Sequence, residues 1–176
     1  MSNPSWREID VYACNRNPFA LLNHTWTLIA AADKTQPAKM NMMTASWGGL
    51  GILWNQPVAT VYIRPQRHTK TLVDAADGFS LSFLPESYRA ALQYCGKISG
   101  RDEDKCKGSG LTPVHDETGG VWFAEAELVL LCRKLYVQEL SGDCFADRDL
   151  LPRFYPENDL HTMYVGAIQR CLVKEE

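Results

Sequence analysis

A short basic segment holds the side chains of this sequence most suited to binding a charged ligand. Residues 64–70, Arg-Pro-Gln-Arg-His-Thr-Lys, place two guanidiniums, an ammonium, an imidazole and a hydroxyl within seven positions and contain no carboxylate. The segment follows an apolar strand-like run, 58–63, and precedes a predicted short helix, whose free N–H groups and dipole favour an anion. We predict a phosphate site here, with a solvated basic turn as the alternative.

The charge distribution along the chain favours a small anion over a long one. Residues 34–73 contain five Lys and Arg residues and no Asp or Glu, although the formal net charge of the chain is −3. The rest of the chain contains the other 13 basic residues and all 21 acidic residues, so it carries a net charge of −8. Because that remainder would repel a polyanion, nucleic acid is disfavoured as a partner. For Lys34 and Lys39 the alternative to anion binding is that they merely flank a turn at Gln36-Pro37.

Two further segments carry polar residues in patterns that suit a ligand. The run from Asn41 to Gly49, Asn-Met-Met-Thr-Ala-Ser-Trp-Gly-Gly, ends a strand-like stretch in hydroxyl residues and glycines that let backbone approach a ligand. Thr44 and Ser46 share one face, and Trp47 offers a flat apolar wall. A strand end with a buried Trp is the alternative. The run from Tyr94 to Lys105 has nearly balanced charges and by composition is a solvated loop after a helix.

Other common site signatures are missing from the sequence. There is no GxGxxG after a strand and no GxxxxGK[ST], and Gly48-Gly49-Leu50-Gly51 lacks the required spacing. The six cysteines show no CxxC pair and no zinc-type spacing, so we predict no metal site. We expect free thiols, with a Cys95–Cys106 disulfide as the alternative.

Strand-like runs dominate the elements that must position these residues. Many strands with few short helices argue against a doubly wound parallel sheet and favour a closed or partly open antiparallel barrel. Helices are predicted over Thr69 to Ala76, capped by His68 or Thr69, and over Glu86 to Lys97. The predicted strands are Thr25 to Ala32, Met40 to Trp47, Pro57 to Arg64, Phe79 to Leu84, Val121 to Gln138 with a break near Ala126, and His161 to Val173.

Length and composition set the class of protein. With 176 residues, 45% of them hydrophobic and 22% charged, the chain is expected to form one globular domain over 1–176. Its apolar runs, such as Leu128 to Cys132, are far shorter than the roughly 20 residues of a membrane helix. Met1 to Val11 contains no apolar signal-peptide region. We therefore expect a cytoplasmic protein that has no membrane partner.

Five motifs occur in an order that resembles a known family. They cover about residues 16–168. On these motifs the chain resembles the flavin reductase-like, flavoredoxin-type proteins of the FMN-binding split barrel. The motifs are Asn-x-Met-Thr-Ala-Ser-Trp-Gly, Ile-Arg-Pro-Gln-Arg-His-Thr, Cys-Gly-x-x-Ser-Gly-Arg-Asp-x-Asp-Lys, Phe-Ala-Glu-Ala-Glu-Leu with Cys-Arg-Lys-Leu-Tyr, and His-Thr-Met-Tyr-Val-Gly.

The resemblance implies a fold, a cofactor and a set of binding residues. The fold would be a mainly β antiparallel split barrel with a few short helices, forming a homodimer with non-covalent FMN near the subunit interface. His161 and Tyr164 would reach the flavin or the partner subunit, with purely structural roles as the alternative. The cofactor-binding residues implied are Asn41, Thr44, Ala45, Ser46 and Trp47 along the isoalloxazine and ribityl groups, Arg64, Arg67, Thr69 and Lys70 at the phosphate, and Lys105 near the flavin.

The resemblance also implies the type of activity. A flavin performs hydride and electron chemistry itself, so we predict no catalytic side chain, in agreement with the lack of a recognisable triad. The leading hypothesis is an NAD(P)H-dependent FMN reductase, with NAD(P)H as co-substrate. The alternative is a flavoredoxin-like electron carrier that serves redox partner proteins without NAD(P)H turnover. A split barrel with a decayed flavin site, or one that binds heme or another phosphate-bearing ligand, is a further possibility.

Overall fold

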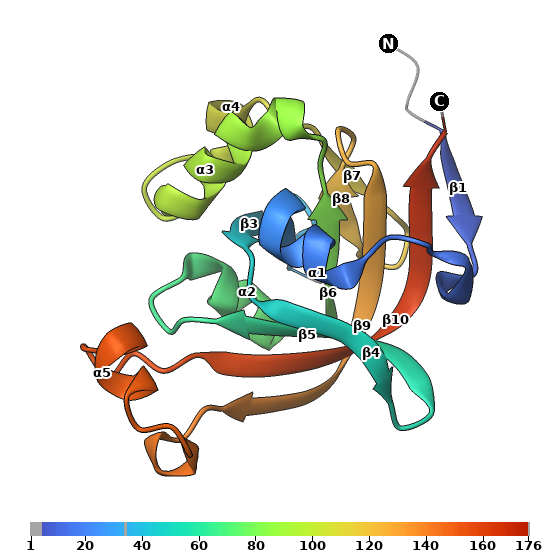
Figure 1. Cartoon of the computed structure of the whole chain (residues 1–176). Coiled ribbons are helices and arrows are strands. Elements are labelled where there is room, and N and C mark those ends of the chain that lie inside the picture. The colour runs from blue at the N-terminus through green and yellow to red at the C-terminus, as the bar shows by residue number, and fades with distance from the viewer. Residues whose placement is uncertain (1–4, 34, 176) are drawn as a thin grey trace.

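The computed structural model describes residues 5–33 and 35–175 (Figure 1). Lys34 and the first four residues, which entered the sequence predictions, lie outside the described residues. One antiparallel sheet contains eight of the ten strands in the described residues, in the order β3-β2-β6-β9-β10-β5-β4 with β1 also on β10. Its strands are β1 (Trp6–Ile9), β2 (Thr27–Ala32), β3 (Met40–Ala45), β4 (Gly48–Leu53), β5 (Gln56–Ile63), β6 (Gly78–Phe83), β9 (Leu128–Glu139) and β10 (Thr162–Lys174).

Short helices and one hairpin cover this sheet. The hairpin pairs β7 (Pro113–His115) with β8 (Val121–Phe123). Figure 1 shows α3 and α4 on one side of the sheet and α5 beyond the far end of β9 and β10. The helices are α1 (Pro18–Ala20), α2 (His68–Ala75), α3 (Arg89–Lys97), α4 (Lys105–Ser109) and α5 (Leu150–Phe154), with single turns at η1 (Val11–Ala13), η2 (Leu21–Thr25), η3 (Glu86–Tyr88) and η4 (Gly142–Cys144).

The two long strands β9 and β10 hold the sheet together. β10 pairs with β9 along most of its length, with β5 over its first half and with β1 over its second half. Register shifts follow Val165 and Ile168, and such irregularities bend a strand. Gly166 sits at the first shift, where a Cβ would lie 2.8 Å from Phe79 Cζ and from Cys132 Cβ. The bend therefore brings β9, β10 and β6 into close contact.

The core is divided between the two sides of the curved sheet. One buried cluster, which includes Ile29, Val61 and Leu81, lies inside the curve. The other, which includes Leu92 and Phe123, lies between the sheet, α3 and the β7–β8 hairpin. The pairing of β2 with β6 stops at Ala30 and Ser80, although β2 runs on to Ala32, so the sheet opens there.

The sequence predictions are confirmed for the long strands and for the two central helices. The break near Ala126 is also confirmed, since it separates β8 from β9. The predicted cap of α2 is wrong: the cap position is Arg67, and it makes no side-chain cap hydrogen bond. Sequence patterns did not predict β1, β4, β7 or the smaller helices. β4 was missed because Gly48-Gly49-Leu50-Gly51 has neither strand propensity nor alternation, and it forms a strand only through its pairing with β5.

No helix in the described part of the chain combines the length and apolar character that membrane crossing requires.

Candidate functional site

The start of α2 presents unpaired backbone and side-chain donors. Because Arg67 caps α2 without a side-chain hydrogen bond, the first N–H groups of the helix keep no cap. Its guanidinium instead donates through Nη1 to the carbonyl of Gly96, at the end of α3. Burial, together with the nearby Arg64, lowers the pKa of Arg67. The loop between β5 and α2 is thus fixed to α3.

Lys105 is the first residue of α4 and is buried, with 5% of its surface exposed. Nζ donates to the carbonyls of Met42 and Cys95, at 2.8 Å each, so it joins β3 to α3. Burial lowers the pKa of this ammonium to about 8, and Arg67 contributes to the lowering. An ammonium has three N–H donors, and these two bonds leave one for a further acceptor.

His68 lies among cations. Burial lowers its pKa, and so do Arg101, Lys105 and Lys39, which are the charged groups that affect it. Arg101 reaches this region from the loop after α3, where its Nη1 donates to the carbonyl of Gln66 at 3.0 Å. The Nδ1 atom of His68 is buried and has no hydrogen-bond partner within the described chain. We call Arg67, His68, Arg101 and Lys105 the cationic cluster.

Asn41 and Thr69 form the floor beside this cluster. Both are buried, and Asn41 Nδ2 donates to Thr69 Oγ1 at 3.1 Å, leaving the Thr69 hydroxyl proton available to an acceptor. Gly100 packs directly on Asn41: a Cβ added to Gly100 would lie 2.3 Å from Asn41 Oδ1. Only glycine fits there without displacing the amide, so the Ser99-Gly100-Arg101 turn is held against β3.

The end of β3 leads from this floor to an exposed aromatic group. Thr44 Oγ1 donates to the carbonyl of Leu92 at 2.5 Å, which anchors the strand to α3, and Ala45 packs on the core. Ser46 is half-buried, and Trp47 is 44% exposed. The alternative of a buried Trp at the strand end is therefore wrong.

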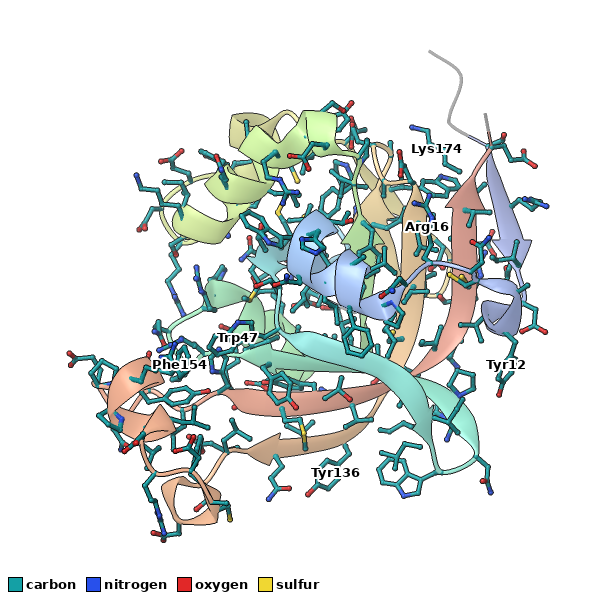
Figure 2. The ribbon with its side chains drawn as sticks, in the orientation of Figure 1. Tyr12, Arg16, Trp47, Tyr136, Phe154 and Lys174 are labelled. Carbon is teal, nitrogen blue, oxygen red and sulfur yellow. The ribbon has the colours of Figure 1, made fainter. Side chains whose placement is uncertain are left out.

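Trp47 lies against the segment that contains α5, as Figure 2 shows for its neighbour Phe154. Its ring centroid is 5.5 Å from that of Phe154 and 5.3 Å from that of His161. His161 Nδ1 is 2.9 Å from the Tyr155 hydroxyl, and burial with Arg64 lowers the His161 pKa to about 4. His161 is therefore neutral at pH 7. Arg67 also contributes to the lowering of this pKa, so its charge acts on the aromatic group.

Three predicted site residues are occupied by other contacts. Arg64 pairs with Asp159, donates to the Phe154 carbonyl at 2.8 Å and stacks over Tyr155. Lys70 pairs with Asp74 at 2.8 Å. As phosphate ligands both stay predictions, and each would first have to leave its carboxylate. Tyr164 is fully buried and donates to Asp74 Oδ1 at 2.6 Å, which favours the structural alternative.

Of the predicted cofactor-binding residues, the structure brings together Arg67, Thr69, Asn41 and Lys105. Trp47 lies just beyond the end of β3, the strand that begins near Asn41. His68 and Arg101 were not in that set. Both lie inside the basic and Ser-Gly-Arg-Asp motifs, so a signal existed. Phe154 and Tyr155 gave no such signal, because none of the five motifs covers them. The arrangement can bind an anion at one end and a planar group at the other.

Comparisons with known proteins place this geometry in a family. The flavin reductase like domain matches residues 19–176. A search of curated protein sequences finds no match. An FMN-binding domain of a flavin reductases-like enzyme from Shewanella baltica is 14% identical, with a TM-score of 0.67 over 98% of this chain and 79% of that one.

Two further solved structures share the fold. Flavoredoxin of Desulfovibrio vulgaris is 20% identical, with a TM-score of 0.66 over 95% of this chain and 78% of its own. An NADH:FAD oxidoreductase from Streptomyces globisporus is 15% identical, with a TM-score of 0.62 over 86% of this chain and 78% of its own. The antiparallel split barrel predicted from the sequence is thereby confirmed. Since the family match spans nearly the whole chain, this protein belongs to the flavin reductase like domain family.

Proposed function

We propose that this protein binds FMN and reduces it with NAD(P)H. The observation that carries the proposal is the cationic cluster beside the exposed Trp47 in a member of this family. The names of its structural neighbours support it, since one is described as an FMN-binding domain and another as an NADH:FAD oxidoreductase.

The residues of the cationic cluster fit a phosphate. The buried Nδ1 of His68 needs a hydrogen-bond partner, and the Lys105 ammonium and the Thr69 hydroxyl each have one donor to offer. The uncapped start of α2 adds backbone N–H groups, which favour a phosphate dianion. We therefore assign the phosphate to the cationic cluster and Thr69.

The same site would hold the flat part of the cofactor near Trp47. Bound FMN supplies the hydride and one-electron chemistry. The chain supplies position: the Thr44–Leu92 contact fixes the end of β3, and Trp47 offers an apolar ring face. A neutral His161, held by Tyr155, adds no positive charge of its own to the aromatic region at pH 7. Because Trp47 is partly exposed, a nicotinamide ring has access from solvent.

We also propose that the protein is a homodimer. An apolar surface begins directly after Trp47 and runs over the β4–β5 hairpin to β9, where Trp54 and Tyr136 lie edge to face at 6.4 Å. Soluble monomers rarely expose large contiguous apolar surfaces, so a second copy of the chain is the occupant we propose. The exposed residues are Ile52 (62%), Leu53 (40%), Trp54 (57%), Tyr136 (40%) and Val137 (45%). Analytical ultracentrifugation tests this, since Trp54→Glu should then give monomers.

An anaerobic visible spectrum tests the activity. The protein is reconstituted with FMN and gel-filtered, and spectra are recorded before and after adding NADH and then NADPH. Bleaching of the flavin bands within the time of a turnover is the expected result. Flavin that is retained but bleaches only with dithionite would refute the reductase and favour the electron-carrier alternative. A protein that retains no flavin is then assayed for NAD(P)H oxidation with free FMN, and no oxidation would also refute the proposal.

A further inference from the structure

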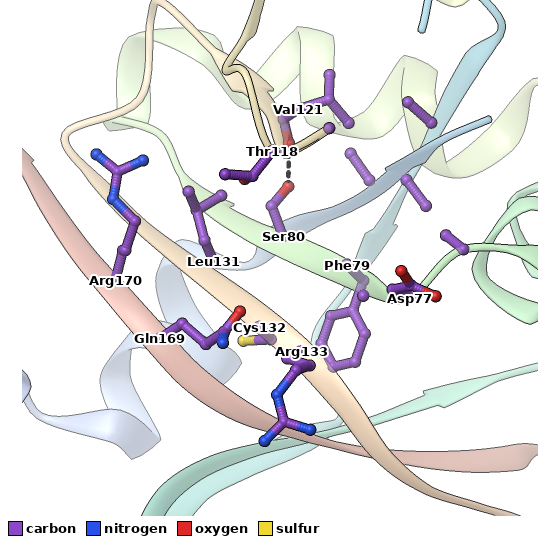
Figure 3. Close-up of a pocket in the computed structure, with 17 residues that line it drawn as sticks. Asp77, Phe79, Ser80, Thr118, Val121, Leu131, Cys132, Arg133, Gln169 and Arg170 are labelled. Carbon is purple, nitrogen blue, oxygen red and sulfur yellow. Dashed lines mark hydrogen bonds between the residues drawn. The ribbon is translucent and has the colours of Figure 1, made fainter. Parts of the chain in front are cut away.

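A cavity that includes none of the residues assigned to the flavin lies where the sheet opens between β2 and β6 (Figure 3). Its volume is about 250 Å³. The lining comes from the ends of β2 and β6, from the middle of β9 and β10, and from the turn between β7 and β8. The residues proposed to bind FMN do not line it, so flavin binding does not account for it.

Small residues create this hollow. β2 ends in Ala30, Ala31 and Ala32, and β6 starts at Gly78, where a Cβ would lie 2.1 Å from the Cys132 carbonyl oxygen. On the face of the sheet that carries the Ala30 side chain, therefore, neither β2 nor β6 fills the gap between them with a large side chain. Cavities of about 150 Å³ with apolar walls hold a benzene ring, so the present volume has room for a ring with a substituent.

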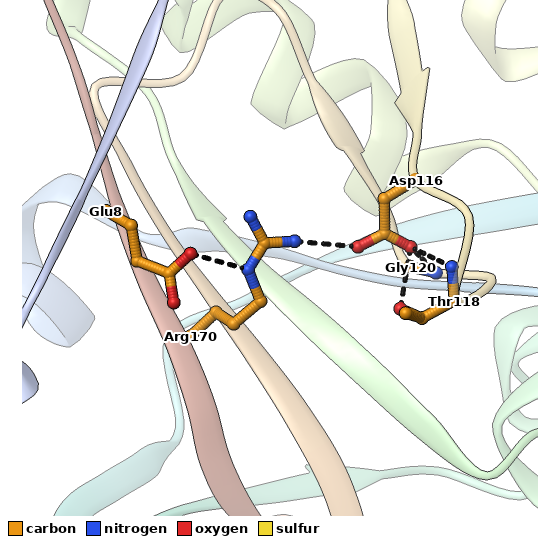
Figure 4. Close-up of polar contacts among 5 residues, drawn as sticks. All are labelled: Glu8, Asp116, Thr118, Gly120 and Arg170. Carbon is orange, nitrogen blue, oxygen red and sulfur yellow. Dashed lines mark hydrogen bonds and ion pairs between the residues drawn. The ribbon is translucent and has the colours of Figure 1, made fainter.

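The β7–β8 turn forms a roof over the cavity, and the polar contacts drawn in Figure 4 fix this turn. Asp116 Oδ1 accepts hydrogen bonds from the backbone N–H groups of Thr118, at 2.9 Å, and Gly120, at 2.8 Å. Its other oxygen accepts from Arg170 Nη1 at 3.0 Å, and Arg170 Nε donates to Glu8 at 2.9 Å. Ser80 on the floor donates to the carbonyl of Val121 in the roof, as Figure 3 shows. The cavity is thus held open by polar contacts on two sides.

The charged residues of the lining favour an anion. Arg133 is exposed and has no hydrogen-bond or ion-pair partner among the described residues. Arg170 is neutralised by its two carboxylates, and the acidic residue of the lining, Asp77, already has an interaction of its own. Arg133 is therefore the guanidinium available to a ligand, and guanidinium forms paired hydrogen bonds with a carboxylate.

We propose that this cavity binds a small carboxylate with a compact apolar body, such as an aromatic acid. The apolar body occupies the space beside Ala30 and Ala32 beneath the turn at Gly119. The carboxylate pairs with Arg133 at the rim. The site is separate from the proposed flavin site, and its occupation does not depend on the proposed function.

Benzoate titrated into the ¹⁵N-labelled full chain tests the proposal, with and without FMN. We expect saturable shifts of the Gly119 and Gly120 amide signals, with a dissociation constant on the order of 1 mM. Arg133→Gln should weaken benzoate binding about tenfold and leave the neutral analogue benzyl alcohol unchanged. Arg7→Gln, an exposed strand arginine outside this lining, is the matched control and should change neither. Ala32→Leu, which fills the cavity, should abolish both.

The outcomes distinguish a carboxylate site in this cavity from weak surface binding and from binding at the flavin site. No saturable shift, equal benzoate affinity in Arg133→Gln, or tighter binding of benzyl alcohol than of benzoate would each overturn the proposal. So would loss of benzoate binding on adding FMN, because the probe would then occupy the flavin site. If Ala32→Leu does not fold, as judged by thermal denaturation, the Arg133→Gln comparison decides the result alone.

Discussion

Replacing Arg67 by Gln should weaken FMN binding and leave riboflavin binding unchanged. Arg67 holds the Gly96 carbonyl with one guanidinium nitrogen, so its remaining N–H groups are available to a phosphate at the start of α2. A hydrogen bond between charged groups contributes about 1.5–3 kcal/mol. At about 1.4 kcal/mol per factor of ten, the FMN dissociation constant should rise by about 10- to 150-fold.

The assay is a fluorescence titration of the apoprotein with each flavin. Riboflavin lacks the phosphate, so the difference between the two ligands isolates the phosphate contact from any general loss of structure. Arg64→Gln is the matched control, because Arg64 is already paired with Asp159 and should affect FMN far less. Arg67→Lys keeps the charge and should recover part of the affinity.

Two results would refute this reasoning. If Arg67→Gln weakened FMN and riboflavin equally, Arg67 would act by holding α3 in place, and the phosphate would lie elsewhere. If Arg64→Gln caused the larger loss, the ion pair with Asp159 would open when FMN binds. The sequence prediction that Arg64 is a phosphate ligand would then hold.

Three further predictions concern the same site. The pKa of Lys105 falls from its ordinary 10.5 to about 8 on burial, so the unfolded chain binds more protons between these values. The free energy of unfolding of the apoprotein should therefore rise with pH from about 8 to 10.5, and urea titrations should show a smaller rise for Lys105→Met. Gly100→Ala should displace Asn41 and weaken FMN binding, which the same fluorescence titration measures; unchanged affinity would separate this turn from the site. Trp47→Ala should alter the visible spectrum of bound FMN, and an identical spectrum would place the flavin elsewhere.

Local patterns in the sequence were sufficient for the strands that carry β-branched and aromatic residues, and for the amphipathic α3. They failed for β4, whose glycines become a strand only by pairing with β5. The cap of α2 was also missed, because Arg67 takes that position through its long-range contact with Gly96, and a capping rule based on Ser, Thr, Asp and Asn does not anticipate it.

The candidate site, too, was predictable from the sequence only in part. A basic segment without acidic neighbours predicted an anion site, but sequence could not show which cations are free. Asp159 lies 95 residues from Arg64, so their pairing depends on the fold. By contrast, Arg101 belongs to a segment whose charges nearly balance, which gave no sign of a site. Its charge acts on His68 because Gly100 lets that turn pack on Asn41.

The state of Lys105 gives an independent argument that the cationic cluster holds an anion. The ammonium makes two hydrogen bonds to carbonyls, yet burial and the repulsion from Arg67 lower its pKa. His68 shows the same imbalance, with a buried nitrogen that lacks a partner among the described residues. A dianion beside both groups would favour their charged forms and satisfy the free donors. Because such a ligand binds only the folded chain, it would stabilise the fold by mass action. A cluster built for stability alone would instead carry a carboxylate at this position, as Lys70 does with Asp74 one turn along α2.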